Sequence, residues 1–241
     1  AIELTAVFSN NDLPGIILGS AAQRLLPRHA VAPGRNVAIL GANAQSVALA
    51  RALADAGVVV KTLLVPADSP LRVDESLRSS LRARGIDVQE GITGLAARAT
   101  DDVLSGVSFW RDDRRSQLDC DALLLSVGFS PAQQLALQAG ARSRFDVSLQ
   151  QHVVEALPEG LFLAGRVNGV FAAEARVQDG LAAGIQAAAH ALATSPAVPP
   201  TARPARDAGS HQHPHPLFDT PRGKRFVDLD EDLTLDDLAN A

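Results

Sequence analysis

The sequence contains one cysteine, Cys120, and neither methionine nor tyrosine among its 241 residues. A lone cysteine forms no disulfide within the chain and anchors no thiolate metal site, which agrees with a reducing compartment. No apolar run approaches the roughly 20 residues of a membrane span, and the first residues lack the basic flank and apolar core of a signal peptide. We therefore expect a cytoplasmic protein with no membrane partner. Because the chain starts at Ala1 and has no methionine, we interpret it as a piece of a longer polypeptide.

Positive charge is also scarce. The formal net charge is -5, and residues 219–241, with seven acids against three bases, carry -4 of it. No basic face is left to bind nucleic acid, so we exclude that class of partner. The acidic tail lacks the central glycine and terminal glutamate of an EF-hand loop, and a solvated helix face is the simpler interpretation.

Strand-like and helix-like stretches alternate between Val37 and Gly91. The almost wholly apolar "VAIL" is typical of a strand buried on both faces of a parallel sheet. It is followed by a helix pattern ending at Gly57, the strand "VVVKTLLV", a second helix pattern and the short strand "IDVQEG". This order predicts an α/β fold with a doubly wound parallel sheet.

The flanking segments extend this pattern. A helix is expected before the first strand, ending at Pro27, and "GLAARAT" with "VLSGVSFWRDD" predicts an antiparallel excursion. Two further buried strands are expected in "LDCDALLLSVGFSP" and "EGLFLAGRVNGV", the latter followed by a long alanine-rich helix.

The segment "GANAQS" after the first strand of this unit raises the question of nucleotide binding. A dinucleotide loop needs glycines so that the backbone turns tightly and approaches the pyrophosphate at a helix N-terminus. Gly41 keeps the turn, but Asn43 and Ser46 stand where the second and third glycines are expected, and Val65 replaces the acid that binds ribose. Two interpretations stay open at this point: a Rossmann-shaped scaffold without a nucleotide, or weak and altered binding.

A second candidate site follows the later strands. In "LFLAGRVNG", flavoproteins usually place an aspartate where Arg166 stands, and an arginine is able to pair with a phosphate or to lie at the surface. The expected cofactor-binding residues of the whole chain are Gly41, Asn43, Ser46, Gly128, Gly165, Arg166, Asn168 and Gly169. No catalytic residue is identified.

Proline, alanine, arginine and histidine dominate residues 194–223, which we interpret as a linker or extended strap. Its His211, His213 and His215 have the residue type of a metal site, but scattered histidines in such a segment are usually solvated, and we expect no metal. In the tail, Thr234 is a candidate N-cap for a helix starting at Leu235. Apolar residues between the acids predict that one face of this tail is docked.

Several stretches resemble, in order, the middle of the alpha subunit of heterotetrameric sarcosine oxidase. They include "CDALLLSVGFSP" and "GLFLAGRVNGVFAAEARVQDGLAAG". The most specific are "FSNNDLPGI", similar to the family's F-x-N-N-D-x-P-G, and "GKRFVDLDEDLT", similar to G-K-x-F-V-D-F-Q-N-D-V-T. The sequence departs from the second pattern at Leu229, Asp230, Glu231 and Leu233, which puts side-chain-specific contacts of that stretch in doubt.

The resemblance implies how the chain is organised. Residues 31–130 are expected to form a pyridine-nucleotide-type Rossmann subdomain, inserted into a first FAD/NAD-binding domain made of residues 1–30 and 131–193. Residues 194–223 are then the linker, and residues 224–241 lead toward a folate-binding domain.

The resemblance also implies a function. Family members oxidise sarcosine to glycine with flavin and oxygen, yielding hydrogen peroxide and a one-carbon unit passed to tetrahydrofolate. The alpha subunit holds a dinucleotide, FAD or NAD, and shares FMN with a partner among the beta, gamma and delta subunits. Two alternatives stay open: a subunit of a related FAD/NAD-dependent amine, opine or cyanide-forming glycine dehydrogenase, or a non-catalytic assembly subunit.

Overall fold

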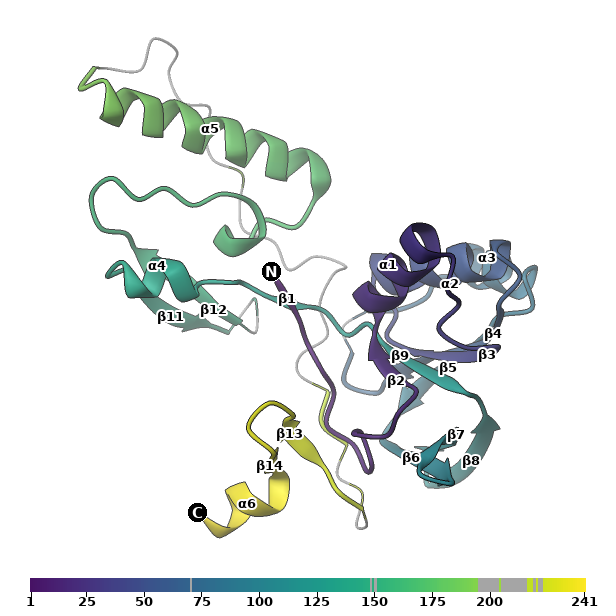
Figure 1. The fold of residues 1–241 in the computed structure, drawn as a ribbon. Helices are drawn as coiled ribbons and strands as arrows, with labels where there is room; N and C mark the ends of the chain where they lie inside the picture. The colour runs from purple at the N-terminus through teal and green to yellow at the C-terminus, as the bar shows by residue number, and fades with distance from the viewer. Residues whose placement is uncertain are drawn as a thin grey trace. The chain divides into compact units, whose positions relative to one another are not determined.

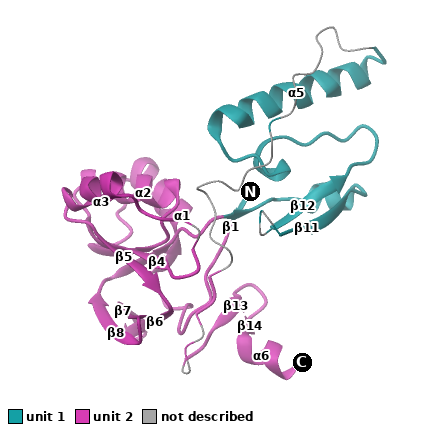
Figure 2. Ribbon diagram, turned by 180° about the vertical axis from the view of Figure 1, so that it is seen from behind, with its two compact units in different colours: residues 1–2, 129–212 teal, residues 3–128, 213–241 magenta. Residues whose placement is uncertain are grey.

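A computed structural model describes residues 1–69, 71–147, 149, 151–194, 204, 216–218, 220 and 223–241. By contacts the chain forms two compact units (Figure 2). Unit 1 comprises Ala1–Ile2 and Phe129–Gln212, and unit 2 comprises Glu3–Gly128 and His213–Ala241. In the part of the chain that is described, no helix combines the length and apolar character needed to cross a bilayer.

A five-stranded parallel sheet is the centre of unit 2, with the strand order β2-β9-β3-β4-β5 (Figure 1). Its strands are β2 (Ile16–Leu18), β3 (Asn36–Leu40), β4 (Val59–Pro66), β5 (Asp87–Ile92) and β9 (Ala122–Leu125). Helices α1 (Gly19–His29), α2 (Ala44–Asp55) and α3 (Glu75–Arg82) connect them. The predicted parallel α/β fold is confirmed, including the strand-helix alternation from β3 to β5.

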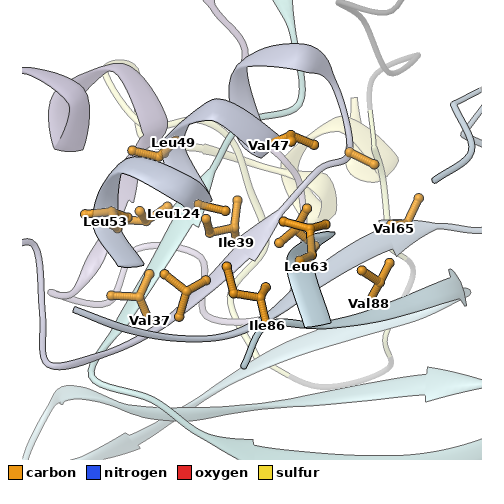
Figure 3. Close-up of a cluster of buried hydrophobic side chains, with 14 of the residues drawn as sticks. Val37, Ile39, Val47, Leu49, Leu53, Leu63, Val65, Ile86, Val88 and Leu124 are labelled. Carbon is orange, nitrogen blue, oxygen red and sulfur yellow. The ribbon is translucent and has the colours of Figure 1, made fainter. Parts of the chain in front are cut away.

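Alternate residues of each strand enter two different hydrophobic cores. Val37 and Ile39 of β3 pack with α2 residues such as Leu49 and Leu53 in the first core, which Figure 3 shows. All these side chains are at least 90% shielded from solvent. At roughly 1.5–3 kcal/mol for each fully buried large apolar side chain, this core is a principal source of stability.

The opposite face of the sheet is covered by strands, where double winding predicts helices. Strands β6 (Gly94–Thr100), β7 (Val103–Arg111) and β8 (Arg114–Asp119) form an antiparallel sheet in that order, as the predicted excursion requires. Leu95 and Val107 of this sheet share the second core with Leu40 of β3. Helices α1, α2 and α3 all contribute to the first core.

Unit 1 contains a hairpin and helices. They are β11 (Arg142–Asp146), β12 (Gln151–Ala156), α4 (Gln134–Gln138), the 3₁₀ turn η1 (Gly165–Asn168) and the 19-residue α5 (Ala173–Ala191). The short strands β1 (Ile2–Glu3) and β10 (Phe129–Ser130) lie where the chain passes between units. The tail adds β13 (Phe226–Asp228), β14 (Leu233–Thr234) and α6 (Leu235–Asn240) to unit 2.

Two features differ from the sequence analysis. The buried strand expected at residues 161–164 is a half-buried coil, because β11 and β12 pair with each other and no described strand pairs with it. Helix α1 continues through Pro27 to His29, and the left-handed φ of 52° at the following Ala30 lets the N–H of Val31 bond back to the carbonyl of Leu25. Strand β2 pairs with β9, so residues 3–30 belong to contact unit 2.

Candidate functional site

The loop between β3 and α2, together with the first turn of α2, contains three of the expected cofactor-binding residues. Gly41 has a φ of +129°, which side chains rarely tolerate, and its N–H donates to the carbonyl of Leu64 in β4 at 2.9 Å. The retained glycine therefore preserves the sharp turn out of the strand. Asn43 and Ser46 follow it and are both buried, with 1% and 0% of their surface exposed.

Asn43 is the N-cap of α2. Its Oδ1 accepts hydrogen bonds from the backbone N–H groups of Gln45 and Ser46, at 3.0 and 2.9 Å. The Ser46 hydroxyl donates to the carbonyl of Asn43 at 2.8 Å. The two residues that replace glycines thus bind each other and close the first turn of the helix.

The other end of the Asn43 side chain reaches the neighbouring strand. Its Nδ2 donates to the carbonyl of Ser126, just after β9, at 2.7 Å, and the N–H of Ser126 donates to Leu40 of β3 at 2.9 Å. Gly128, another expected site residue, has a φ of +130° and accepts from the N–H of Leu4 at 2.9 Å. Val65, in the position of the ribose-binding acid, is fully buried.

The remaining expected residues form one turn in unit 1. Gly165 and Gly169 both have positive φ, +72° and +78°, at the two ends of η1. The buried carboxylate of Asp179 in α5 accepts from the N–H of Gly165 at 2.7 Å and from the amide of Asn168 at 3.3 Å. The guanidinium of Arg166 lies over the ring of Phe129, 4.6 Å from its centroid.

The comparisons with known proteins agree with this architecture. Residues 13–192 match the family of pyridine nucleotide-disulphide oxidoreductases. The chain belongs to this family. The parallel sheet of unit 2 is therefore part of a pyridine nucleotide-disulphide oxidoreductase fold.

The curated relatives are more specific. This oxidoreductase chain is 28% identical over its whole length to the sarcosine oxidase subunit alpha of Rhizobium meliloti (strain 1021), and 28% identical to that of Corynebacterium sp. (strain P-1). It spans about a quarter of their length, 24% and 26%. The resemblance inferred from the sequence is thus confirmed.

Solved structures share the oxidoreductase fold. L-proline dehydrogenase from P. horikoshii superposes with a TM-score of 0.58 at 19% identity, covering 81% of this chain and 34% of that chain. The HOCl-induced flavoprotein disulfide reductase RclA from Escherichia coli gives a TM-score of 0.54 at 18% identity, covering 76% and 41%.

Two residues of these sites were missed by the sequence analysis. Asp179 accepts the N–H of Gly165, and the carbonyl of Ser126 accepts a hydrogen bond from the Asn43 side chain. Neither residue belongs to a glycine motif. The only signal for Asp179 was an acid within the small-residue run "VQDGLAAG". Because a carboxylate is rarely buried without donors, an acid in such a run indicates a partner elsewhere in the chain.

The described residues do not by themselves fit a dinucleotide in unit 1. The backbone N–H groups of Gly165, Gly169 and Val170 donate within the turn or to Asp179. The glycine-rich loop that would hold the pyrophosphate is not among the residues of this sequence. Asn168 is held through its side chain by the same aspartate.

A separate polar cleft of about 320 Å³ lies at the amino ends of β3 and β9, away from Gly41. It is lined by Asn36, Lys61, Ser105, Asp119, Cys120 and Asp121. Burial and the neighbouring Asp121 carboxylate raise the pKa of Cys120 to about 12, so its thiol is a neutral core group. In open α/β sheets, ligands bind at the carboxyl ends of the strands, the opposite edge to this cleft.

No group of three metal-ligating side chains occurs in the described ranges. The candidate ligands His211, His213 and His215 lie outside the described residues.

The tail is bound to the first residues of unit 2. The N–H of Phe226 donates to Asn11 Oδ1 at 2.9 Å, and Asn11 Nδ2 donates back to the Phe226 carbonyl at 2.8 Å. The N–H of Asn10 donates to the carbonyl of Lys224, and Val7 forms a parallel bridge with Leu217. Docking of the tail is confirmed for its backbone, whereas Leu229 and Leu238 stay about half exposed.

The predicted helix start in the tail is also confirmed. Thr234 caps α6 in a capping box with Asp237: the Asp237 N–H donates to the Thr234 hydroxyl, and the Asp237 carboxylate accepts from the Thr234 N–H. The Asp237 carboxylate also accepts from the Thr234 hydroxyl, and this bond, together with the one from the Thr234 N–H, lowers the pKa of Asp237 below its usual value.

Proposed function

We propose that this chain is the central part of a sarcosine oxidase alpha-like subunit, which takes part in the oxidative demethylation of sarcosine to glycine. The single observation that supports this most is the pair of hydrogen bonds between Asn11 and Phe226. These residues belong to "FSNNDLPGI" and "GKRFVDLDEDLT", the two stretches most similar to that family. Because Asn11 in the first stretch binds the backbone of Phe226 in the second, the two family-like stretches form one structural unit, and this supports the proposal.

In the proposed reaction, two electrons and a proton leave a methyl C–H of sarcosine, and a flavin bound in the complex would supply this oxidising chemistry. Water then releases the methyl carbon as a one-carbon unit, which tetrahydrofolate accepts through a folate-binding domain beyond the tail. Oxygen takes the two electrons and two protons to give hydrogen peroxide. The small amine substrate is bound by partner subunits, and no catalytic residue is assigned to this chain.

We further propose that the protein works in the cytoplasm with beta, gamma and delta subunits. FAD or NAD belongs to the first dinucleotide domain, of which the turn at Gly165–Asn168 and Gly169 is one edge, and FMN is shared with a partner subunit. The predicted division into residues 1–30, 31–130 and 131–193 remains our proposal for how the family's two domains are interleaved, although the contact units divide after Gly128.

The role of the described residues in this proposal is to hold domains together. Asn10 and Asn11 bind the backbone of Lys224 and Phe226, and the Ser9 and Thr220 hydroxyls bond to each other. Phe218 is buried in the second core of unit 2. The segment leading to the proposed folate-binding domain is thereby fixed to the first residues of unit 2 by hydrogen bonds as well as by side-chain burial.

The test is to purify the full-length protein with its co-encoded partner proteins. We expect oxygen consumption and equimolar peroxide with sarcosine, and formaldehyde release when tetrahydrofolate is omitted. Oxidation of an opine, glycine or another amine with an artificial acceptor but not oxygen would instead favour the dehydrogenase alternative. Absence of flavin from the purified complex would favour the assembly subunit.

A further inference from the structure

We infer that the parallel sheet of unit 2 binds neither NADH nor NADPH, and that Asn43 is the residue that excludes them by taking the place of the dinucleotide phosphate. The inference does not depend on the proposed function. It concerns the dinucleotide site at the start of α2, which this chain fills with its own Asn43 side chain.

The position of the excluded ligand follows from the strand order. In the order β2-β9-β3-β4-β5, the chain runs outward from β3 through β4 to β5, while β9 lies on the other side of β3. The switch in direction between β3 and β9 makes a crevice at the carboxyl ends of these strands. Dinucleotides bind in such crevices, with the pyrophosphate at the N-terminus of the following helix, here α2.

Three N–H donors at this helix start are already used within the chain. At the N-terminus of α2, the N–H groups of Gln45 and Ser46 point to Asn43 Oδ1 at 3.0 and 2.9 Å. Gly41 donates its N–H into the sheet, to Leu64. An amide oxygen thus stands at the place that a phosphate oxygen takes in a loop with three glycines.

The same side chain also closes the crevice between the strands. Asn43 Nδ2 donates to the Ser126 carbonyl at 2.7 Å, so the carboxamide joins the ends of β3 and β9. With 1% of its surface exposed, Asn43 is packed as part of the protein interior. A phosphate would enter only if this side chain left, which breaks three hydrogen bonds and leaves the buried carbonyl of Ser126 without that donor.

The neighbouring helix shows the same arrangement. Glu3 Oε2 accepts the N–H of Ser20 in the first turn of α1 at 2.8 Å. Gly19 allows this close packing, since a Cβ at this position would lie 3.2 Å from Glu3 Oε1 and 3.1 Å from Ser126 Cβ, and these atoms would have to shift. Both helix N-termini beside Ser126 are therefore bound by side chains of the chain itself, one of them a carboxylate.

The ribose end of the site is also missing. The acid that binds the ribose hydroxyls stands at the end of the second strand of such units, and β4 has the buried Val65 there. Loss of the phosphate donors and of the ribose acceptor together leaves the sheet without either polar anchor. Electrons therefore do not enter the protein from a reduced pyridine nucleotide at this subdomain.

Amide hydrogen exchange in the full-length protein tests the inference, because it reports on this loop separately from any dinucleotide bound in another domain. We expect the exchange rates of the Gln45 and Ser46 amides to be unchanged by NADH or NADPH at about 1 mM, the top of the usual Michaelis range. In Asn43→Ala we expect both amides to exchange about tenfold faster, because the cap is lost. The matched control is Asn36→Ala at the opposite end of β3, which should leave these two amides unchanged.

Slower exchange of Gln45 and Ser46 on addition of either nucleotide to the wild-type protein would overturn the inference. Unchanged exchange of both amides in Asn43→Ala would show that Asn43 is not the group that occupies the helix N-terminus. If Asn43→Ala does not fold, the wild-type titration still decides whether the crevice is closed.

Discussion

Asn11 and Phe226 lie 215 positions apart and exchange two hydrogen bonds, as two residues of neighbouring strands do. Here the side-chain carboxamide of Asn11 forms the two hydrogen bonds that the backbone of a neighbouring strand would otherwise form. Asn11 is itself buried, with 4% of its surface exposed, and its Nδ2 also donates to the carbonyl of Ala6. The contact explains why a tail with no fully buried side chain from residue 223 onward still has a defined path beside unit 2.

Replacing this carboxamide should release the tail. In Asn11→Ala the N–H and carbonyl of Phe226 lose their partners, at a cost of roughly 1–3 kcal/mol. We expect the amide of Phe226 to exchange faster and protease to cut the tail sooner, measured by hydrogen exchange and limited proteolysis. Asp12→Ala changes the exposed neighbouring side chain and serves as the control. Equal protection of Phe226 in both variants would contradict the role of Asn11.

Asp179 should stabilise the turn at Gly165. Asp179→Ala leaves the Gly165 N–H and the Asn168 amide without this acceptor, and we expect unit 1 to lose roughly 1–3 kcal/mol in chemical denaturation. Asp179→Asn keeps one oxygen for the Gly165 N–H and should lose less. Identical denaturation midpoints for the alanine variant and the wild type would show that the buried carboxylate contributes nothing.

Cys120 should make the protein less stable at high pH. Burial first, and Asp121 second, raise the pKa of its thiol to about 12 from an ordinary value of 9.0. The folded state therefore keeps a proton that the unfolded state releases, so the stability contributed by the neutral thiol is present below pH 9 and is lost as the pH rises toward 12. Relative to Cys120→Ala, the free energy of unfolding of the wild type should fall across this window in urea titrations. A constant difference between the two proteins would contradict it.

The capping box should hold Asp237 ionised at low pH. Hydrogen bonds from the Thr234 hydroxyl and N–H lower the pKa of its carboxyl, so the stability that they contribute is present above the unfolded pKa and is lost as the pH falls through the folded pKa. In Thr234→Val the hydroxyl is gone, and NMR titration should find the pKa of Asp237 raised toward its ordinary value. Thr234→Ser keeps a hydroxyl and should keep the shift. Equal pKa values in the valine and wild-type proteins would contradict this.

Local patterns were enough to predict the parallel sheet. The apolar runs of β3 and β4 and the helix pattern between them follow one another within a few residues, and this alternation is typical of strands buried on both faces of a parallel sheet. The N-cap at Thr234 was predictable for the same reason, because its partner is three residues away. The segment at residues 161–164 shows the limit of such patterns: an apolar run predicts a strand only if another strand pairs with it.

The amino-acid sequence by itself therefore determined most of the strands and helices of unit 2 and the turn at Gly41, since each of these depends on residues close together in the chain. Whether that loop accepts a nucleotide depends on where the Asn43 carboxamide points, and its partner Ser126 is 83 positions away. Asn11 and Phe226 likewise meet only after the sheet has formed. An asparagine side chain donates and accepts equally well with many partners, so only the packed fold decides which donors it uses and which site it closes.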